Sequence, residues 1–269
     1  MSNAIKRLML GSLLAVAALF SLNSMAGDTL ARVVDFKVLK VGMSGSQPPM
    51  NATGRDGGLM GFDVDLAKAM AAAMRVQLEI KTMPFGDLMT ALEEDKIDMV
   101  ISGMAITPER TELASFVGPY MMSGKSILTK DSVLAKMSSS EQFNRKDLKL
   151  LALSNSTSAT FVRSAAPDAQ LIEIKNYDEG VAMLIDGKAD AMVADMPICV
   201  LTVLRNPNAG LTTLERPLSV EPLGIAVSAD DPQFLNLVDN YLEAYGKTGV
   251  LSKLRKKWLE DNSWIAALP

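Results

Sequence analysis

The chain has 269 residues with 27 basic and 31 acidic side chains, a net charge of −4 that indicates no basic surface for nucleic acid. It has no histidine, which removes the usual general base and the commonest metal ligand, and its lone Cys199 excludes an internal disulfide. We therefore expect no metal and no cofactor. We expect Cys199 to be a small buried residue.

The N-terminus predicts export. Lys6 and Arg7 precede the apolar run 8–22, and Ser24-Met25-Ala26 then places small residues at the positions that determine cleavage. The run is shorter than the ~20 apolar residues that a membrane span needs. We expect residues 1–26 to be a signal peptide cleaved after Ala26, and the mature protein to reside in the periplasm.

Strands and helices are expected to alternate along the rest of the chain. Short apolar runs predict strands, and apolar stripes at helical spacing predict helices that begin near Asp63 and Asp87 and a last long helix that stops at Gly246. Residues 44–58 are expected to form a loop, 125–129 to be a crossing segment and 222–227 to be a second crossing strand. The strands are expected at 37–43, 76–83, 97–102, 148–153, 171–174 and 191–194, and another helix at 178–186.

A faint internal repeat suggests two similar lobes. The stretch 92–100 resembles the stretch 184–193: in both, a helix ends at a turn with a lysine, and an aspartate then enters an apolar strand. Alternating helices and apolar strands indicate an α/β fold with parallel sheets covered on both faces. Because ligands bind beyond the carboxyl ends of such strands, two facing lobes would bring those ends to one cleft.

The stretch from Asp98 to Arg110 is the first candidate binding segment. An apolar strand ends at Ser102-Gly103, and Thr107-Pro108 has the pattern of a helix N-cap followed by the first helical residue. Arg110 then falls in the first turn, where a cation gains nothing from the helix dipole, so an anion such as a carboxylate is the expected partner. The alternative is a surface arginine paired with Glu112.

The second lobe supplies a second candidate surface. The polar turn 154–158 opens a helix and offers hydroxyls and free amides to an anion, although a simple N-cap cluster has the same pattern. Asp195 follows the strand 191–194 and could hold a ligand ammonium or merely cap a helix. An arginine for a carboxylate and an aspartate for an ammonium, across one cleft, indicate a receptor for an amino acid.

Several motifs in this order resemble the family-3 extracellular solute-binding proteins, the polar-amino-acid receptors of bacterial ABC importers. They run from about Val38 to Trp258 and are Gly61-Phe-Asp-Val-Asp-Leu-Ala-Lys-Ala-Met70, the segment 97–110, Phe116-Val-Gly-Pro-Tyr120 and Ala189-Asp-Ala-Met-Val-Ala-Asp195. The resemblance implies a periplasmic-binding-protein fold of type II, with two lobes of mostly parallel sheet flanked by helices and joined by two hinge crossings. It implies lobe one at 27–124 plus 220–269 and lobe two at 125–219.

The resemblance also implies roles for individual residues. Arg110 would grip the ligand carboxylate, and Asp195 would take its ammonium. Phe85 would lie against the ligand, or alternatively fill the core under its turn. The remaining ligand-binding residues are expected to be the amides of Gly103 and Ala105, the hydroxyls of Thr157 and Ser158, and Ser102 and Ser44 on the first lobe.

The residue at the position of Ser44 bears on ligand choice. Receptors of basic amino acids in this family often carry an acidic residue there, and without one a ligand cation would lack its partner. We therefore expect a polar uncharged or acidic amino acid, delivered by a monomeric receptor to an inner-membrane ABC permease. The alternatives are a cyclohexadienyl dehydratase-like enzyme, although no glutamate follows Asp195 in 196–201, and a periplasmic sensory module.

Overall fold

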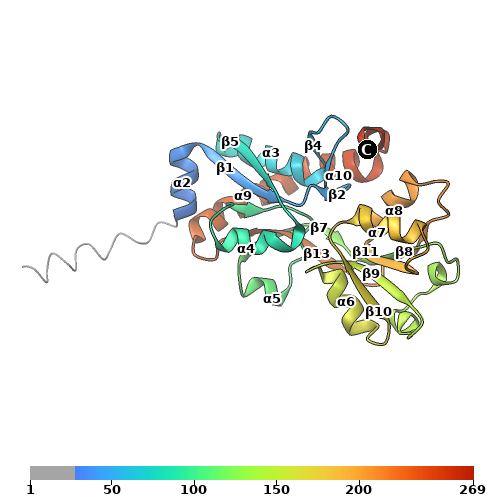
Figure 1. Cartoon of the computed structure of the whole chain (residues 1–269). Coiled ribbons are helices and arrows are strands. Elements are labelled where there is room, and N and C mark those ends of the chain that lie inside the picture. The colour runs from blue at the N-terminus through green and yellow to red at the C-terminus, as the bar shows by residue number, and fades with distance from the viewer. Residues whose placement is uncertain (1–27) are drawn as a thin grey trace, which may run out of the picture.

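The computed structural model describes residues 28–269 as two units, each built around a five-stranded sheet with helices packed against it (Figure 1). The chain passes from the first sheet to the second between Ser123 and Lys125 and returns between Thr213 and Glu221. The expected signal peptide lies outside the described residues. None of the helices within 28–269 has the length and apolar character needed to cross a membrane.

The first sheet has the strand order β5-β1-β6-β13-β7. Strand β1 runs parallel to β5 and β6, whereas β13 runs antiparallel to β6 and β7. The strands are β1 (Val38–Met43), β5 (Gln77–Thr82), β6 (Met99–Val100), β7 (Ser115–Ser123) and β13 (Glu221–Val227).

The second sheet repeats this pattern in the order β10-β9-β11-β8-β12. Strand β9 runs parallel to β10 and β11, and β8 runs antiparallel to β11 and β12. The strands are β8 (Lys125–Thr129), β9 (Lys149–Leu153), β10 (Gln170–Ile174), β11 (Ala191–Asp195) and β12 (Thr212–Thr213).

Two expectations about these sheets need correction. The sheets are mixed rather than mostly parallel, because each combines two parallel and two antiparallel strand pairs. Residues 125–129, expected as a crossing segment, are a strand inside the second sheet, whereas 222–227, expected as a crossing strand, are a strand of the first. Residues 222–227 are apolar, and 125–129 are all buried although three of them are polar, so neither pattern distinguishes a parallel from an antiparallel strand.

The helices cover both sheets, and the core confirms the expected stripe on α3, where Ala67, Met70 and Ala71 are buried. The last long helix runs through Gly246 to Lys247, and the left-handed residue that follows is Gly249 at φ 80°. Gly246 is therefore not the stop that was expected. The helices are α2 (Asp28–Phe36), α3 (Phe62–Met74), α4 (Leu88–Glu93), α5 (Pro108–Thr111), α6 (Thr157–Ala165), α7 (Tyr177–Ile185), α8 (Met196–Arg205), α9 (Pro232–Lys247) and α10 (Val250–Arg255).

Some elements lie where none was expected. A three-stranded sheet occupies the stretch expected as a loop, with strands β2 (Ser46–Gln47), β3 (Asn51–Thr53) and β4 (Leu59–Met60). Helix α2 was not anticipated either, and α8 was anticipated only in the alternative that Asp195 caps a helix. Strand β6 covers only two of the six residues expected at 97–102.

The repeat in the sequence is also a repeat in the structure. Asp98, just before β6, accepts a hydrogen bond from the amide of Lys40 at 2.7 Å and donates its own amide to the Lys40 carbonyl at 2.8 Å. Asp190, just before β11, makes the same two bonds with Lys149, at 2.7 and 3.0 Å. Each aspartate therefore ties its central strand to the neighbouring parallel strand.

Candidate functional site

Arg110 lies between the two lobes. The side chain of Thr107 caps α5 by accepting the Arg110 amide at 3.3 Å, and Pro108 is the first helical residue, as the sequence predicts. The guanidinium donates to the carbonyl of Ala105 at 2.9 Å and, across the cleft, to the carbonyl of Asn155 at 3.2 Å. It lies 5.5 Å from the centre of the Phe85 ring. These contacts join lobe one to the start of α6.

The guanidinium is short of negative charge. Within residues 28–269 no carboxylate lies at ion-pair distance from Arg110, so the alternative of a surface pair with Glu112 is not found there. Burial lowers the pKa of Arg110, and the charges of Glu221 and Asp195 oppose that shift from further away. Arginine nevertheless remains protonated in proteins. A partly buried cation whose hydrogen-bond partners are neutral carbonyls can attract an anion.

Three more charged side chains contact one another where the chain crosses between the sheets, and the charges of two of them, Asp195 and Glu221, act on Arg110. The Lys125 ammonium is 2% exposed and lies 2.7 Å from a carboxylate oxygen of Asp195 and 2.9 Å from one of Glu221. Thr157 donates its hydroxyl to the same Glu221 oxygen at 2.9 Å. The two carboxylates raise the pKa of Lys125 although its burial opposes this, so the ammonium stays charged. Two carboxylates thus share one ammonium, which leaves a single negative charge; we call Lys125, Asp195 and Glu221 the charged triad.

The two helix-cap alternatives have different outcomes. Asp195 occupies the N-cap position of α8, but its side chain makes no capping bond and faces Lys125 instead. Ser156 does cap α6, because its hydroxyl accepts the amide of Ala159 at 3.2 Å. Thr157 is therefore free of the capping role and contacts the charged triad, whereas Ser158 is 1% exposed.

Several polar groups of lobe one that were expected to contact a ligand are hydrogen-bonded to the protein itself. Ser102 is fully buried and its hydroxyl accepts the amide of Ser44 at 3.0 Å. The amide of Gly103 donates to the hydroxyl of Tyr120 at 3.2 Å, so this amide, expected to face a ligand, already has a partner. Ala105 contributes its carbonyl to Arg110, as described above. Ser44 and Phe85 line a hollow of about 930 Å³ between the lobes, together with Asn155.

The sequence missed two of these residues. Lys125 and Glu221 each begin a strand directly after the chain crosses between sheets, and both were overlooked because the crossing segments were judged by their apolar residues. A charged residue at the edge of an apolar run, next to each expected crossing, is the signal that could have identified them. Cys199 is fully buried as expected, and burial raises the pKa of its thiol to about 12.

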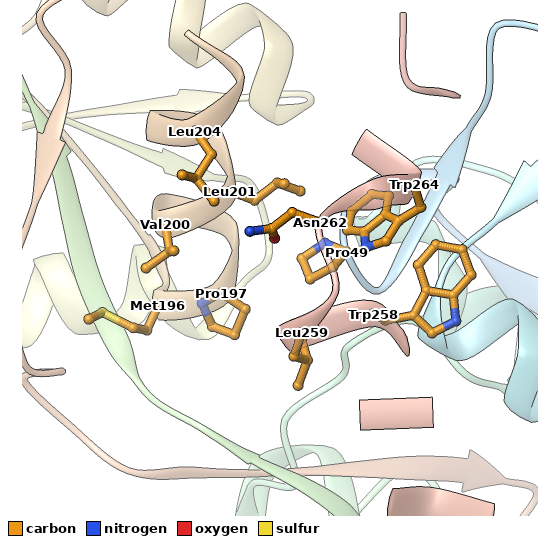
Figure 2. A pocket seen from close by; sticks show the side chains of 10 residues that line it. All are labelled: Pro49, Met196, Pro197, Val200, Leu201, Leu204, Trp258, Leu259, Asn262 and Trp264. Carbon is orange, nitrogen blue, oxygen red and sulfur yellow. The ribbon is translucent and has the colours of Figure 1, made fainter. Parts of the chain in front are cut away.

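A second hollow lies away from Arg110. Figure 2 shows this groove of about 300 Å³ between α8, with Met196, Val200 and Leu204, and the C-terminal segment, with Leu259 and Trp264. Its lining has no charged side chain, so it does not suit a charged ligand. Beside it the C-terminal segment bridges the lobes: the carbonyl of Pro269 accepts from Arg205 at 3.1 Å, and that of Leu268 from Arg55 at 2.7 Å.

Two similar α/β lobes, linked by two crossings and with charged groups of both signs in the cleft between them, define a two-lobed binding protein. No group of three acidic or cysteine side chains within 28–269 is arranged to hold a metal ion. The chain belongs to the bacterial extracellular solute-binding proteins, family 3, whose profile matches residues 39–261.

Relatives of this chain include both receptors and an enzyme. The ABC transporter arginine-binding protein 1 of Escherichia coli (strain K12) is 28% identical over 239 residues, which cover 86% of this chain and 93% of that protein. The cyclohexadienyl dehydratase of Pseudomonas aeruginosa is 26% identical over 231 residues, with 86% of each chain covered. Among solved structures, the ancestral amino acid-binding protein AncCDT-1, a precursor of cyclohexadienyl dehydratase, is 33% identical with a TM-score of 0.79, over 86% of this chain and all of that one.

Proposed function

We propose that this protein is a periplasmic receptor that binds an amino acid between its two lobes and delivers it to an ABC permease. The observation that carries the proposal is a pair of unneutralised charges of opposite sign. Arg110 is a cation without a carboxylate partner, and the charged triad has one surplus negative charge. A ligand α-carboxylate bound to Arg110 and a ligand α-ammonium bound to the charged triad would neutralise both charges.

The charge balance also bears on the ligand side chain. The backbone charges of an amino acid complete the neutralisation of Arg110 and the charged triad, so a further charge on the ligand would need one of the other charged residues that line the hollow, Asp87, Lys175 or Asp178, as its partner. We propose an uncharged polar side chain, favoured over an acidic one and over a basic one. The Escherichia coli relative is named for arginine, so a basic ligand is the principal competing outcome.

Closure of the lobes on the ligand is part of the proposal. Two hydrogen bonds already join the lobes. Arg110 of lobe one donates to the carbonyl of Asn155 in lobe two, and Thr157 of lobe two donates to Glu221 at the start of the returning strand β13. A ligand that contacts both sides would favour the closed arrangement. We expect small-angle scattering to show a more compact particle at saturating ligand, and an unchanged profile would contradict closure.

An enzyme on this scaffold is the second candidate, because a dehydratase is among the relatives. A general acid would have to come from a carboxyl group, and the cleft does contain Glu221. However, one oxygen of Glu221 already accepts bonds from both Lys125 and Thr157, which holds this side chain in the charged triad. Incubation with prephenate or arogenate, followed by product absorbance, tests this candidate; turnover would replace the receptor proposal.

A thermal-shift screen of the common amino acids is the test of the proposed function. A ligand present at a thousandfold excess over its Kd should stabilise the protein by ~4 kcal/mol. We expect a large shift with one or a few uncharged amino acids in the parent protein and a much smaller one in Arg110→Ala. A shift with lysine or arginine alone would overturn the side-chain preference, and no shift with any amino acid would overturn the receptor proposal. A sensory module would give the same shifts but would not bind the permease complex.

A further inference from the structure

One leucine of lobe two is buried among residues of lobe one. Leu201 lies on α8, a helix that packs against strands β8, β11 and β12 of the second sheet. Its side chain is nevertheless buried, and Figure 2 shows it extending from α8 toward Trp264 on the other side of the groove. Among residues 28–269, its apolar cluster otherwise consists of lobe-one residues: Ala52, Met60, Trp264, Ile265 and Leu268. The burial of Leu201 therefore depends on the two lobes lying together.

Arg205, one helical turn further along α8, adds a polar contact to the same segment. Its guanidinium donates to the carbonyl of Pro269 at 3.1 Å. That segment is in turn fixed to lobe one, because the amide of Arg55 donates to the Ala267 carbonyl at 2.9 Å and the Arg55 side chain donates to the Leu268 carbonyl at 2.7 Å. Helix α8 of lobe two is thus attached to a segment that lobe one holds in place.

The same helix connects this attachment to the charged triad. Asp195 is the N-cap residue of α8, and Leu201 and Arg205 lie ~9 and ~15 Å further along the helix axis at a rise of ~1.5 Å per residue. A helix of this length moves as a rigid element. Contacts at its far end therefore help to hold Asp195 in the closed arrangement, at a distance from the ligand.

We propose that Leu201 and Arg205 form a latch with residues 267–269, which stabilises the closed arrangement and strengthens binding of an amino acid that the latch does not contact. This inference rests on the proposed function, including closure of the lobes. The latch and an amino acid in the cleft favour the same arrangement, so each strengthens the other. Loss of the latch should weaken amino-acid binding, mainly through faster release.

The chain carries its own optical reporter for this latch. Its two tryptophans, Trp258 and Trp264, both line the groove beside α8, and their ring centres are 5.0 Å apart. Neither lines the hollow between the lobes near Arg110. Tryptophan emission therefore responds to movement of α8 against the C-terminal segment rather than to direct contact with an amino acid in the cleft.

The test titrates the protein with an equimolar mixture of the common amino acids, without tryptophan and tyrosine because these would add their own emission. We expect tryptophan emission to change, with a midpoint that rises at least about tenfold in Leu201→Ala, because this leucine packs against lobe one only in the closed arrangement. Arg205→Gln should raise the midpoint about threefold or more. The other neighbour of Arg205, Asp178, lies 3.9 Å away and is 80% exposed, so its loss adds little.

Leu204→Ala is the matched control for Leu201→Ala. Leu204 lines the same groove from the same helix, but it is 50% exposed and lies outside the cluster of Leu201. It should leave the midpoint unchanged. Leu251→Ala removes a leucine from the core of lobe one and controls for a general loss of stability: it should lower the unfolding temperature without moving the midpoint.

A thermal-shift measurement with the same mixture separates the two proposals. No thermal shift in the parent protein would overturn the proposed function. A thermal shift without a change in tryptophan emission, or an unchanged midpoint in Leu201→Ala or Arg205→Gln, would overturn the latch and leave the receptor proposal standing.

Discussion

The two lobes share one structural unit and differ at its end. In each, a helix, a turn with a lysine and an aspartate lead into the central strand, and the aspartates Asp98 and Asp190 make equivalent bonds to the neighbouring strand. After β6 the chain continues into neutral Ser102-Gly103 and then to Arg110; β11 instead ends at the acidic Asp195. The repeated unit thus supports the fold, and the residues beyond its strand determine which charge each lobe presents.

The largest expected difference between the lobes concerns Lys125. In Lys125→Met the carboxylates of Asp195 and Glu221 lose their shared cation, and we expect the free energy of unfolding to fall by about 2–4 kcal/mol. This lies below the value for a fully buried pair because both carboxylates retain some contact with water. Urea unfolding measures the loss.

The matched control for this substitution is the repeat lysine of lobe one. Among residues 28–269, Lys96 forms an ion pair with Glu94 alone, and its side chain is 66% exposed, so Lys96→Met should change stability by less than about 0.5 kcal/mol. Adding Glu221→Gln to Lys125→Met should recover part of the loss, since one fewer charge is left unpaired. Equal effects of the two lysine substitutions would remove the distinction between a scaffold lysine and a site lysine.

The second prediction concerns pH and the buried acid of lobe one. Burial raises the pKa of Asp63 from 3.8 to about 6, so the folded protein binds this proton more tightly than the unfolded chain does. Asp63 therefore makes the free energy of unfolding fall as pH rises from about 4 to about 6, by at most about 1.4 kcal/mol per pH unit.

Asp63→Asn removes this contribution, so the stability difference between parent and variant should change across that pH range. The exposed carboxyl groups Glu79 and Asp147, whose pKa values are lowered by Lys81 and Arg145, contribute the opposite trend to both proteins and cancel in the comparison. Urea unfolding at several pH values measures the difference. Parallel stability curves would show that Asp63 titrates as it does in the unfolded chain.

A smaller difference is expected between the two repeat aspartates. Asp98 is 1% exposed and also pairs with Arg32, whereas Asp190 is exposed. Removing the Asp98 side chain leaves the Lys40 amide buried without its acceptor, so Asp98→Ala should destabilise by about 1–3 kcal/mol. Asp190→Ala should destabilise by less than about 1 kcal/mol, because water can replace the lost acceptor. If Asp190→Ala destabilises the protein more than Asp98→Ala does, burial does not determine how much this hydrogen bond contributes to the free energy of unfolding.

The smallest effect is expected at the turn before each lysine. Asp95 has φ 56° and Gly187, at the equivalent place, has φ 69°; both follow a helix whose last carbonyls they help to satisfy. Glycine adopts this conformation without the strain that a Cβ adds. Asp95→Gly should therefore stabilise lobe one by about 0.5–1 kcal/mol, and Gly187→Asp should destabilise lobe two by a similar amount. Thermal unfolding of both variants tests this symmetry.

Much of the fold could be predicted from the sequence because its signals are local. The cap at Thr107, the stripe on α3, the repeat and most strand positions depend on residues within one element or turn. Strand direction in β8 and β13 depends on the path of the whole chain, and strands of two or three residues such as β2 and β3 are too short to carry a periodic pattern. Local patterns therefore predicted the parts of each lobe but not the mixed sheets.

The site was predicted in part for the same reason. Arg110 and Asp195 were identified because each follows a local pattern at the end of a strand. Lys125, the partner that Asp195 shares with Glu221, could not be identified, because it lies 70 residues away from Asp195 in the chain. Glu221 comes close to Lys125 only because the chain returns to the first sheet. The contact of Leu201 with lobe one likewise depends on how the lobes come together, and no local pattern indicates it.

The most direct test of the zwitterion site compares an amino acid with two analogues that each lack one backbone charge. Using the ligand that the thermal-shift screen identifies, calorimetry would measure its Kd, that of its α-carboxamide and that of the acid without the α-amino group. The parent should lose ~30-fold or more in affinity with either analogue. Arg110→Ala should bind the amino acid and its carboxamide equally, yet still prefer the amino acid to the form without the amino group. If Arg110→Ala discriminates against the carboxamide as strongly as the parent does, Arg110 does not bind the ligand carboxylate and the account is contradicted.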